Sequence, residues 1–542
     1  MTTTASTRDG TTGGPVRRGQ AAGIDPTRYT VAPHRVAQLT RRIVHGPLAE
    51  TRANPAPMTG QRLASVPQST PSDVQVAVDH ARAAQRAWSR LPVARRAQVL
   101  LRMHDLVLER QVELLDLIQL ETGKTRLHAF EEVADVALVC RHYGRRAARY
   151  LAPERHMGVV PGLTRAVTHH DPVGVVGVIT PWNYPLTLPI SDSIPALVAG
   201  NAVVLRPDSL TPLTALLGVE LLCEAGLPES VLQVVTGSGS VIGQAVIDSV
   251  DYVCYTGSTG VGRGVARSAA GRLIGASMEL GGKNSMYVRP DADLGRAVSG
   301  ALRAAFSSGG QLCVHAERLI LHEQIADGFL AEFVPMVASM RLGGALEYGY
   351  DMGSLISQSQ LEQTQRHVAD AVDHGATVLA GGHARPDIGP FVHEPTVLVG
   401  VTPAMACRDE ETFGPVLSVY RVSSDDEAVA LANDTAYGLN GSVWGRDVTA
   451  ATAVARRIRC GTVNVNEHYS AAWGTTGAPM GGMSDSGLGR RHGAEGIRKY
   501  TEAQTVATQA LIGLAPLPGM RDQQFTGLLS SGLTALKRIG WR

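Results

Sequence analysis

A cysteine stands in a glycine-rich turn in the second half of the chain. The stretch SSGGQLCVHAER covers residues 307–318, and Cys313 follows a Gly-Gly-Gln turn. A thiol on an exposed bend is a candidate nucleophile, whereas a cysteine inside a packed core behaves as a small hydrophobe. The residue alone leaves both interpretations open, so the surrounding motifs must decide between them.

Other polar residues have types that suit a cysteine nucleophile. Glu279 ends an apolar stretch in MELGGKN, as either a solvated edge residue or a general base whose pKa is raised by partial burial. Asn183 lies in TPWNYP, where its amide either donates to an oxyanion or serves ordinary turn chemistry. The stretch DYVCYTGSTGVGR adds a Gly/Ser turn between an expected strand and helix, which is the context of a phosphate-binding turn or merely a tight connection.

The elements that must position these residues can be predicted from the hydrophobic pattern. Residues 72–123 have helical spacing, and after residue 173 short Val/Ile-rich runs alternate with Ala/Leu-rich helical segments. The runs are VGVVGVI, NAVVLRP, VLQVVTG and VDYVCYTG, and a second alternating region covers residues 286–462 with ERLILHE, TVLAGG, EPTVLVG and PVLSVYRV. This alternation predicts βαβ units, and therefore two α/β lobes, each with its own mainly parallel sheet.

Composition excludes several classes of protein. The chain has 542 residues, 44% hydrophobic and 18% charged, with a net charge of +1, which provides no basic field for nucleic acid. Its six cysteines lie far apart without metal-ligand spacing, which predicts a reducing compartment and no metal site. We see neither a signal peptide nor a membrane-spanning stretch, so we expect a cytoplasmic protein.

Taken together and in order, the motifs resemble those of the aldehyde dehydrogenase superfamily. The resemblance covers about residues 57–510 and includes ETGKTR, TPWNYP, YTGSTGVGR, MELGGKN, GGQLCVHAER, EETFGPV and APMGGMSDSGLGR. Within this superfamily, the chain most resembles the actinobacterial branch that is labelled succinate-semialdehyde dehydrogenase. The resemblance implies an α/β fold of the aldehyde dehydrogenase type, with a Rossmann-like cofactor domain, an α/β catalytic domain and a small bridging β element.

The resemblance also implies domain limits and an oligomeric assembly. Homodimers or homotetramers are expected, because subunits of this family share a sheet through the bridging element. The C-terminal tail has an amphipathic pattern over Phe525, Leu528, Leu529, Leu536 and Ile539, which suits either packing on a neighbouring subunit or weak contact with a membrane surface. The expected division is an N-terminal tail (1–56), a cofactor-binding domain (57–153 and 174–280), a catalytic domain (281–484), a bridging element (154–173 and 485–511) and a C-terminal tail (512–542).

The resemblance assigns roles to matched positions. Cys313 would attack the aldehyde carbon, Asn183 would donate to the oxyanion, and Glu279 would activate the water that hydrolyses the thioester. Glu279 also argues against a CoA-acylating relative, and the three residues together argue against a non-enzymatic scaffold. The implied cofactor-binding residues are Thr180, Pro181, Trp182, Arg206, Ser209, Gly257, Ser258, Leu280, Glu411 and Phe413.

Two positions in LRPDS depart from the usual family pattern and bear on the cofactor. Arg206 stands where a lysine usually binds the adenosine ribose, and Ser209 stands where NAD-preferring members often carry glutamate. An arginine fork and a neutral hydroxyl suit a phosphate monoester. We therefore expect NADP as the preferred cofactor, with NAD also accepted.

A second departure reverses two charges. A lysine nine residues after the Asn of PWN and a glutamate after SGxGR form a buried pair in much of the family, but here the positions are Asp192 and Arg491. They are either a charge-swapped ion pair or two unrelated substitutions. Arginine is not a proton relay at neutral pH, so a relay through this pair would need another route.

The third departure concerns the substrate. Enzymes acting on succinate semialdehyde use two arginines to hold the substrate carboxylate, but Ser191 and the stretch 307–309 occupy those places here. Another cation, such as Arg155 or one on the C-terminal tail, would then have to bind the carboxylate. The expected reaction is oxidation of succinate semialdehyde to succinate, with apolar or aromatic aldehydes as the alternative.

Overall fold

The computed structural model describes residues 26–158, 163–510 and 513–538. Its first large sheet has six strands in the order β19-β9-β8-β5-β6-β7, all parallel except β19. The chain runs from β5 outward to β7 and then returns to the other side of β5, so the strand order switches between β5 and β8. Ligands bind at such a switch point, outside the carboxyl ends of the strands. The strands are β5 (Val175–Ile179), β6 (Ala202–Arg206), β7 (Leu232–Val234), β8 (Tyr252–Thr256), β9 (Gly275–Glu279) and β19 (Gly487–Leu488).

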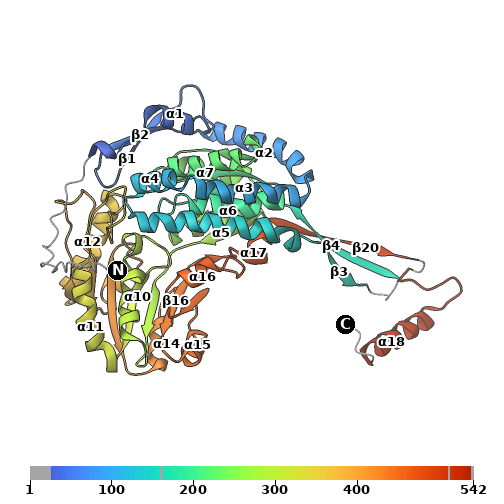
Figure 1. Cartoon of the computed structure of the whole chain (residues 1–542). Coiled ribbons are helices and arrows are strands. Elements are labelled where there is room, and N and C mark those ends of the chain that lie inside the picture. Colours follow the sequence, from blue (N-terminus) through green and yellow to red (C-terminus); the bar gives the residue numbers. More distant parts are fainter. Residues whose placement is uncertain (1–25, 159–162, 511–512, 539–542) are drawn as a thin grey trace, which may run out of the picture.

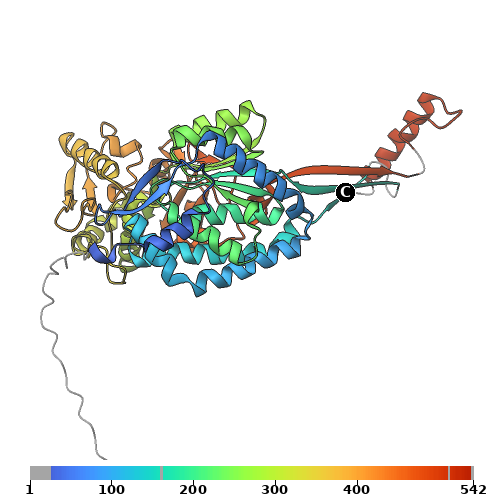
Figure 2. The same ribbon diagram turned by 90° about the horizontal axis from the view of Figure 1, so that it is seen from above.

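Helices cover both faces of this sheet, as Figures 1 and 2 show. Strands β5, β6 and β8 are buried along their whole length, which explains their uninterrupted apolar composition. Helix α6 is buried at every residue, because it lies inside the molecule and has no solvent-facing side. The helices of this half are α2 (Pro71–Arg90), α3 (Val93–Glu109), α4 (Gln111–Thr122), α5 (Arg126–Tyr150), α6 (Thr187–Ala199), α7 (Pro212–Glu224), α8 (Gln244–Ser249) and α9 (Thr259–Gly271).

The second large sheet has seven strands in the order β12-β13-β14-β11-β10-β16-β17. Only its edge strand β12 is antiparallel to its neighbour. The strands are β10 (Asn284–Val288), β11 (Ala316–His322), β12 (Thr377–Ala380), β13 (Thr396–Val399), β14 (Val416–Val422), β16 (Asn440–Trp444) and β17 (Thr462–Val465). Its helices are α10 (Leu294–Phe306), α11 (Glu323–Ala338), α12 (Gln358–Asp373), α13 (Ala406–Asp409), α14 (Asp425–Asn433), α15 (Val448–Ala455) and α16 (Ser470–Gly474).

A three-stranded antiparallel sheet projects from the body as an arm (Figures 1 and 2). It consists of β3 (Glu154–Met157), β4 (Thr164–Pro172) and β20 (Thr501–Gln509), with β4 in the middle. Helix α17 (Gly493–Arg498) precedes β20, and helix α18 (Asp522–Arg538) follows it beyond the arm. Helix α18 contains most of the residues of the amphipathic pattern in the C-terminal tail, although Ile539 lies outside the described residues.

The N-terminal region differs from the expected tail. The described part of residues 1–56 packs on the body from Tyr29 onward, with Leu39 and Ile43 buried. Arg35 forms ion pairs with Glu113 at 2.8 Å and Glu220 at 2.7 Å, which fixes helix α1 (Pro33–Thr40) against α4 and α7. A β-hairpin follows, of β1 (Thr51–Pro55) and β2 (Arg62–Pro67), and a small sheet pairs β15 (Tyr437–Gly438) with β18 (Met483–Ser484). The 1–56 prediction is therefore corrected, because residues 26–56 are an integral part of the body.

Candidate active site

Cys313 lies just after a tight turn between α10 and β11. Ser308, Gly309 and Gly310 all have positive φ angles, of 52°, 65° and 69°. A Cβ at Gly310 would come within 2.2 Å of the Gly414 carbonyl oxygen, so the turn requires glycine there. The Cys313 carbonyl accepts a hydrogen bond from Asn284 Nδ2 at 2.7 Å. The turn therefore holds the cysteine backbone in one place.

The Cys313 thiol is protonated in the free protein. Burial, together with the nearby carboxylates of Glu279 and Glu411, raises its pKa to about 12, although Arg491 acts in the opposite direction. A thiol becomes a good nucleophile only as the thiolate. Cys313 therefore needs a group close by that takes its proton.

Glu279 is placed to be that group. It is the last residue of β9 and is buried, and its Oε1 has no hydrogen-bond partner among the described residues. Burial raises its pKa to about 7, while the cations Arg491 and Lys499 lower it. A carboxylate with this pKa is matched to proton transfer near neutral pH.

Asn183 is held rigidly beside the cysteine turn. Its Nδ2 donates to the carbonyl of Gln311 at 3.0 Å, which leaves its second N–H for another acceptor. The backbone carbonyl of Asn183 accepts a hydrogen bond from Lys124 Nζ at 2.7 Å, and Lys124 forms a buried ion pair with Glu132 at 2.8 Å. Glu132 also accepts the backbone N–H groups that begin helix α6. This arrangement can present an amide N–H to an oxyanion.

Six predicted cofactor residues follow the carboxyl ends of neighbouring strands. Ser258 precedes the first residue of α9, so the backbone N–H groups of this helix start face the switch point. A Cβ at Gly257 would lie 2.4 Å from Tyr255 Oη, which explains the glycine. Thr180, Pro181 and Trp182 follow β5, Gly257 and Ser258 follow β8, and Leu280 follows β9.

Arg206 and Ser209 lie together at the end of β6. The Arg206 Nε and Nη2 donate to the Gly237 carbonyl at 3.1 and 2.7 Å, and Ser209 Oγ donates to the same oxygen at 3.1 Å. Arg206 Nη1 lies 3.7 Å from Asp208. The guanidinium is thus oriented by one carbonyl and carries further donors for an anion.

Glu411 and Phe413 come from the second half of the molecule. Glu411 Oε1 accepts the N–H of Gly282 at 2.9 Å, and burial raises the pKa of Glu411 to about 8. The ring of Phe413 meets that of Trp182 edge-on, with centroids 5.5 Å apart. The structure thus brings predicted residues from both large sheets into contact.

Sequence reasoning missed the residue that holds this segment. Glu317, on β11, accepts the backbone N–H groups of Thr412 at 3.0 Å and Phe413 at 2.9 Å. It also forms a buried ion pair with Lys283. Phe413 has a φ of 52°, an unfavourable angle for a bulky residue that these bonds maintain. A glutamate four residues after the cysteine was the available signal.

Asp192 and Arg491 form the predicted charge-swapped ion pair. Arg491 Nη2 lies 2.8 Å from Asp192 Oδ1, and both side chains are buried. Burial lowers the pKa of Arg491, but the carboxylates of Asp192, Glu279 and Asp135 outweigh it and hold the pKa above its usual value. The alternative of two unrelated substitutions is wrong.

A chamber of about 150 Å³ opens beside the cysteine turn. Of the described residues that line it, only Arg303 carries a positive charge, whereas Arg155 lies on the arm strand β3. Arg303 is 3.4 Å from Glu467 and stacks over the Tyr469 ring. The other charged or aromatic lining residues are Glu131, Asp135, Tyr184, Tyr469 and Trp473.

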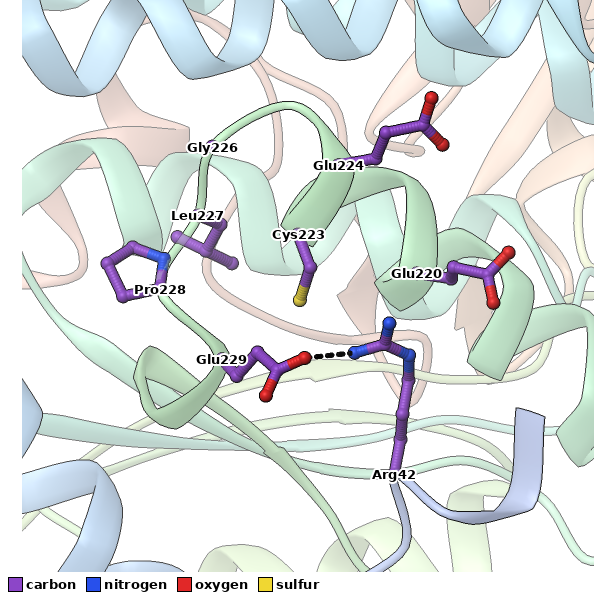
Figure 3. A pocket seen from close by; sticks show the side chains of 8 residues that line it. All are labelled: Arg42, Glu220, Cys223, Glu224, Gly226, Leu227, Pro228 and Glu229. Carbon is purple, nitrogen blue, oxygen red and sulfur yellow. Dashed lines mark hydrogen bonds and ion pairs between the residues drawn. The ribbon is translucent and has the colours of Figure 1, made fainter. Parts of the chain in front are cut away.

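A separate recess around Cys223 has a volume of about 470 Å³, and Figure 3 shows the side chains that line it. Burial raises the pKa of the Cys223 thiol, and the recess contains none of the predicted site residues. Within the described residues no cluster of three or more His, Cys, Asp or Glu side chains could hold a metal, and no helix there is long and apolar enough to cross a membrane.

Comparison with known proteins identifies the class to which this fold and site belong. The model of the aldehyde dehydrogenase family matches residues 47–506. The chain therefore belongs to the aldehyde dehydrogenase family, as the sequence motifs predict.

Individual relatives cover most of the chain. A protein of Mycolicibacterium smegmatis named putative succinate-semialdehyde dehydrogenase, NADP(+), is 51% identical over 484 residues, 89% of this chain and 94% of that one. Betaine aldehyde dehydrogenase of Bacillus subtilis is 36% identical over 457 residues, 83% of this chain and 92% of that one. Among solved structures, PnpE from Pseudomonas sp. WBC-3 is 35% identical with a TM-score of 0.82, covering 86% of this chain and 96% of that one.

Proposed function

We propose that this protein oxidises an aldehyde to a carboxylic acid through a thioester on Cys313. The observation that carries the proposal is a buried thiol near a carboxylate, that of Glu279, whose pKa is about 7. Glu279 takes the thiol proton, and the thiolate attacks the aldehyde carbon. The free N–H of the Asn183 amide and the backbone N–H of Cys313 bind the resulting oxyanion, and loss of hydride from the carbon would give the thioester. Glu279 releases its proton to solvent and then, as the carboxylate, activates the water that hydrolyses the thioester.

We propose NADP as the cofactor, with NAD accepted at lower efficiency. When bound, the cofactor would supply the acceptor for the hydride that leaves the aldehyde carbon. The start of α9, with Gly257 and Ser258, would bind the pyrophosphate, and Arg206 with Ser209 would bind the ribose phosphate. The remaining candidate residues for holding the cofactor are Thr180, Pro181, Trp182, Leu280, Glu411 and Phe413. The N–H groups of Arg206 that do not bind the Gly237 carbonyl are available to a phosphate. The name of the M. smegmatis relative also specifies NADP.

The substitution Ser209→Glu tests the cofactor. A carboxylate at this position would repel a ribose phosphate, so we expect the ratio of kcat/KM for NADP to that for NAD to fall by about tenfold or more. Ser209→Ala is the matched control and should leave the ratio within about threefold. A ratio that is unchanged in Ser209→Glu would contradict the assignment of this pocket.

For the substrate we propose succinate semialdehyde, which is converted to succinate. The support is the name of the M. smegmatis relative and the presence of one cation, Arg303, at the chamber. A guanidinium with several free donors is suited to a carboxylate. The substrate carboxylate would then bind at the chamber mouth while the aldehyde reaches Cys313.

An uncharged aromatic or apolar aldehyde is the second candidate. Three aromatic rings line the chamber, and the carboxylates of Glu131 and Asp135 would repel an anion. These carboxylates are themselves bound, Glu131 by Tyr469 Oη at 2.9 Å and Asp135 by Ser191 Oγ at 2.7 Å. Burial also raises the pKa of both groups, to about 6 for Asp135.

The two candidates separate in one kinetic comparison with NADP. If succinate semialdehyde is the substrate, its kcat/KM should exceed that of butanal by more than about 100-fold, and Arg303→Met should remove most of this preference. Arg296→Met, an exposed arginine on the same helix, is the control. Equal rates, or a preference for benzaldehyde, would favour the uncharged substrate.

We further propose the domain division given in the sequence analysis, with the N-terminal tail shortened to residues 1–25 because residues 26–56 belong to the body. We also propose a homodimeric or homotetrameric assembly. Support for assembly comes from the exposed arm strand β20. Support for a cytoplasmic location comes from the six cysteines, all of which are free thiols. Helix α18 exposes Leu528, Leu529 and Leu533, so it remains suited to a neighbouring subunit or weak contact with a membrane surface.

A further inference from the structure

Four charged side chains surround the buried carboxylate of Glu279. Three of them have strong partners elsewhere: Asp192 and Arg491 pair with each other at 2.8 Å, and Arg490 donates to the carbonyls of Gly482 and Gly489. The fourth is Lys499, the residue that follows α17. No motif of the sequence analysis singled out this lysine.

The ammonium of Lys499 is hydrogen-bonded to a residue of β9, the strand that carries Glu279. Its Nζ donates to Ser277 Oγ at 3.2 Å, and Ser277 is buried two residues before Glu279 on β9. Residues two apart on a strand project to the same face, so the ammonium and the Glu279 carboxylate share one side of the sheet. The neighbouring Tyr500 donates to the Asp192 carbonyl at 3.2 Å and holds this segment in place.

The electrostatics of the cluster follow from this geometry. Burial raises the pKa of Glu279, and Asp192 raises it further. The cations Arg491, Lys499 and Arg490 lower it, in that order. Burial lowers the pKa of Lys499, but it is outweighed by Cys254, Tyr252, Asp192 and Glu279, so the lysine stays a cation at neutral pH. Since Arg491 is paired with Asp192, the cations whose charge is left for Glu279 are Lys499 and, with a smaller effect, Arg490, which binds only neutral carbonyls.

We propose that Lys499 is a positioning residue for the general base: its ammonium, anchored on Ser277, stabilises the ionised carboxylate of Glu279 and so sets the pH range in which the base works. The inference rests on the proposed role of Glu279. It requires only that the charge of Lys499 be present, and no proton needs to pass through the lysine.

The test measures how fast iodoacetamide alkylates Cys313 between pH 5 and 9 in the protein without cofactor, followed by mass spectrometry. The limb assigned to Glu279 is the one that Glu279→Gln removes. In Lys499→Met this limb should move to higher pH by about one unit, because an opposite charge near a carboxylate lowers its pKa by about that much or more. Lys499→Arg keeps the charge and should restore the wild-type limb.

Two further variants protect the interpretation. Ser277→Ala removes the anchor and should shift the limb in the same direction by less, whereas Lys537→Met, on the exposed helix α18, should leave it unchanged. An unshifted limb in a folded Lys499→Met protein, or equal shifts in the Met and Arg variants, would overturn the proposal. The alkylation readout needs no substrate, so a failure of the proposed aldehyde oxidation would be seen separately, as absent turnover with a normal alkylation profile.

Discussion

At the scale of single residues, the site depends on two acids that burial keeps partly protonated. Glu279 has a pKa of about 7 and Glu411 of about 8, and both lie near the Cys313 thiol. Because the pKa of the thiol, about 12, lies above that of Glu279, about 7, the proton would move to Glu279 only together with attack of the sulfur on the aldehyde carbon, and a carboxyl group of this pKa can then release it near neutral pH. Burial is the largest cause of both raised pKa values.

This arrangement predicts the pH dependence of turnover. Glu279 must be ionised to act as a base, so kcat should rise as the pH increases through about 7 and then level off. Glu279→Gln should remove this limb and lower kcat by about 10²–10⁴-fold. The measurement is steady-state production of NADPH across pH 5.5–9. Glu410→Gln is the control, because Glu410 is an exposed glutamate next to Glu411 in the sequence. A limb near pH 7 that persists in Glu279→Gln would assign it to another group.

The family could be predicted from single residues because its motifs are short, whereas the catalytic roles of these residues stay predictions. Cys313, Glu279 and Asn183 each stand in such a motif, and their order along the chain indicated one family. Glu317 and Lys499 were missed because their contacts join distant segments: Lys499 and Ser277 are 222 residues apart in the sequence. No local pattern marks a lysine after a short helix as the neighbour of a base.

At the scale of elements, the pair of Asp192 and Arg491 joins helix α6 to the segment between β19 and α17. Arg491 also lies 5.7 Å from the ring of Trp473, which lines the chamber. The pair therefore connects the helix that follows Asn183 with the wall of the substrate chamber. Reversing both charges together keeps this connection.

We expect the pair to be strongly coupled in stability. Removing one partner leaves a buried charge unpaired, so Asp192→Asn or Arg491→Gln alone should cost about 3–5 kcal/mol. The double variant should lose less than the sum of the two, by about 1–3 kcal/mol. Urea unfolding monitored by tryptophan fluorescence gives all four free energies. Additive losses would show that the 2.8 Å contact contributes nothing to stability.

The strands that could be predicted from the sequence are the ones that are most deeply buried. Strands β5, β6 and β8 could be predicted because a strand covered on both faces has an uninterrupted apolar sequence. The two-residue strands β15 and β19 could not, because they are too short to show any periodicity. Yet β19 pairs with Glu279 itself and so closes the sheet edge at the base.

At the scale of the whole molecule, composition and alternation predicted two α/β sheets, and the structure has them. The N-terminal region was wrongly expected to be a tail, because its many polar and charged residues suggested exposure to solvent. The sequence does not show that Arg35 forms buried contacts with other helices. Its ion pairs with Glu113 and Glu220 depend on helices that lie far along the chain. Charged residues predict a solvated surface unless the sequence also reveals their partners.

The arm carries the last prediction. Strand β20 is an edge strand in the described part of the chain, exposed along nearly its whole length, and an edge of this kind is a template for a strand of a second subunit. A lysine on such an edge opposes pairing, so Val506→Lys should lower the mass measured by light scattering to that of a smaller assembly or a monomer. Deleting residues 511–542, which removes α18 but leaves β20 intact, should not change the mass. If the deletion dissociates the protein and Val506→Lys does not, helix α18 holds the subunits together instead of the arm strand.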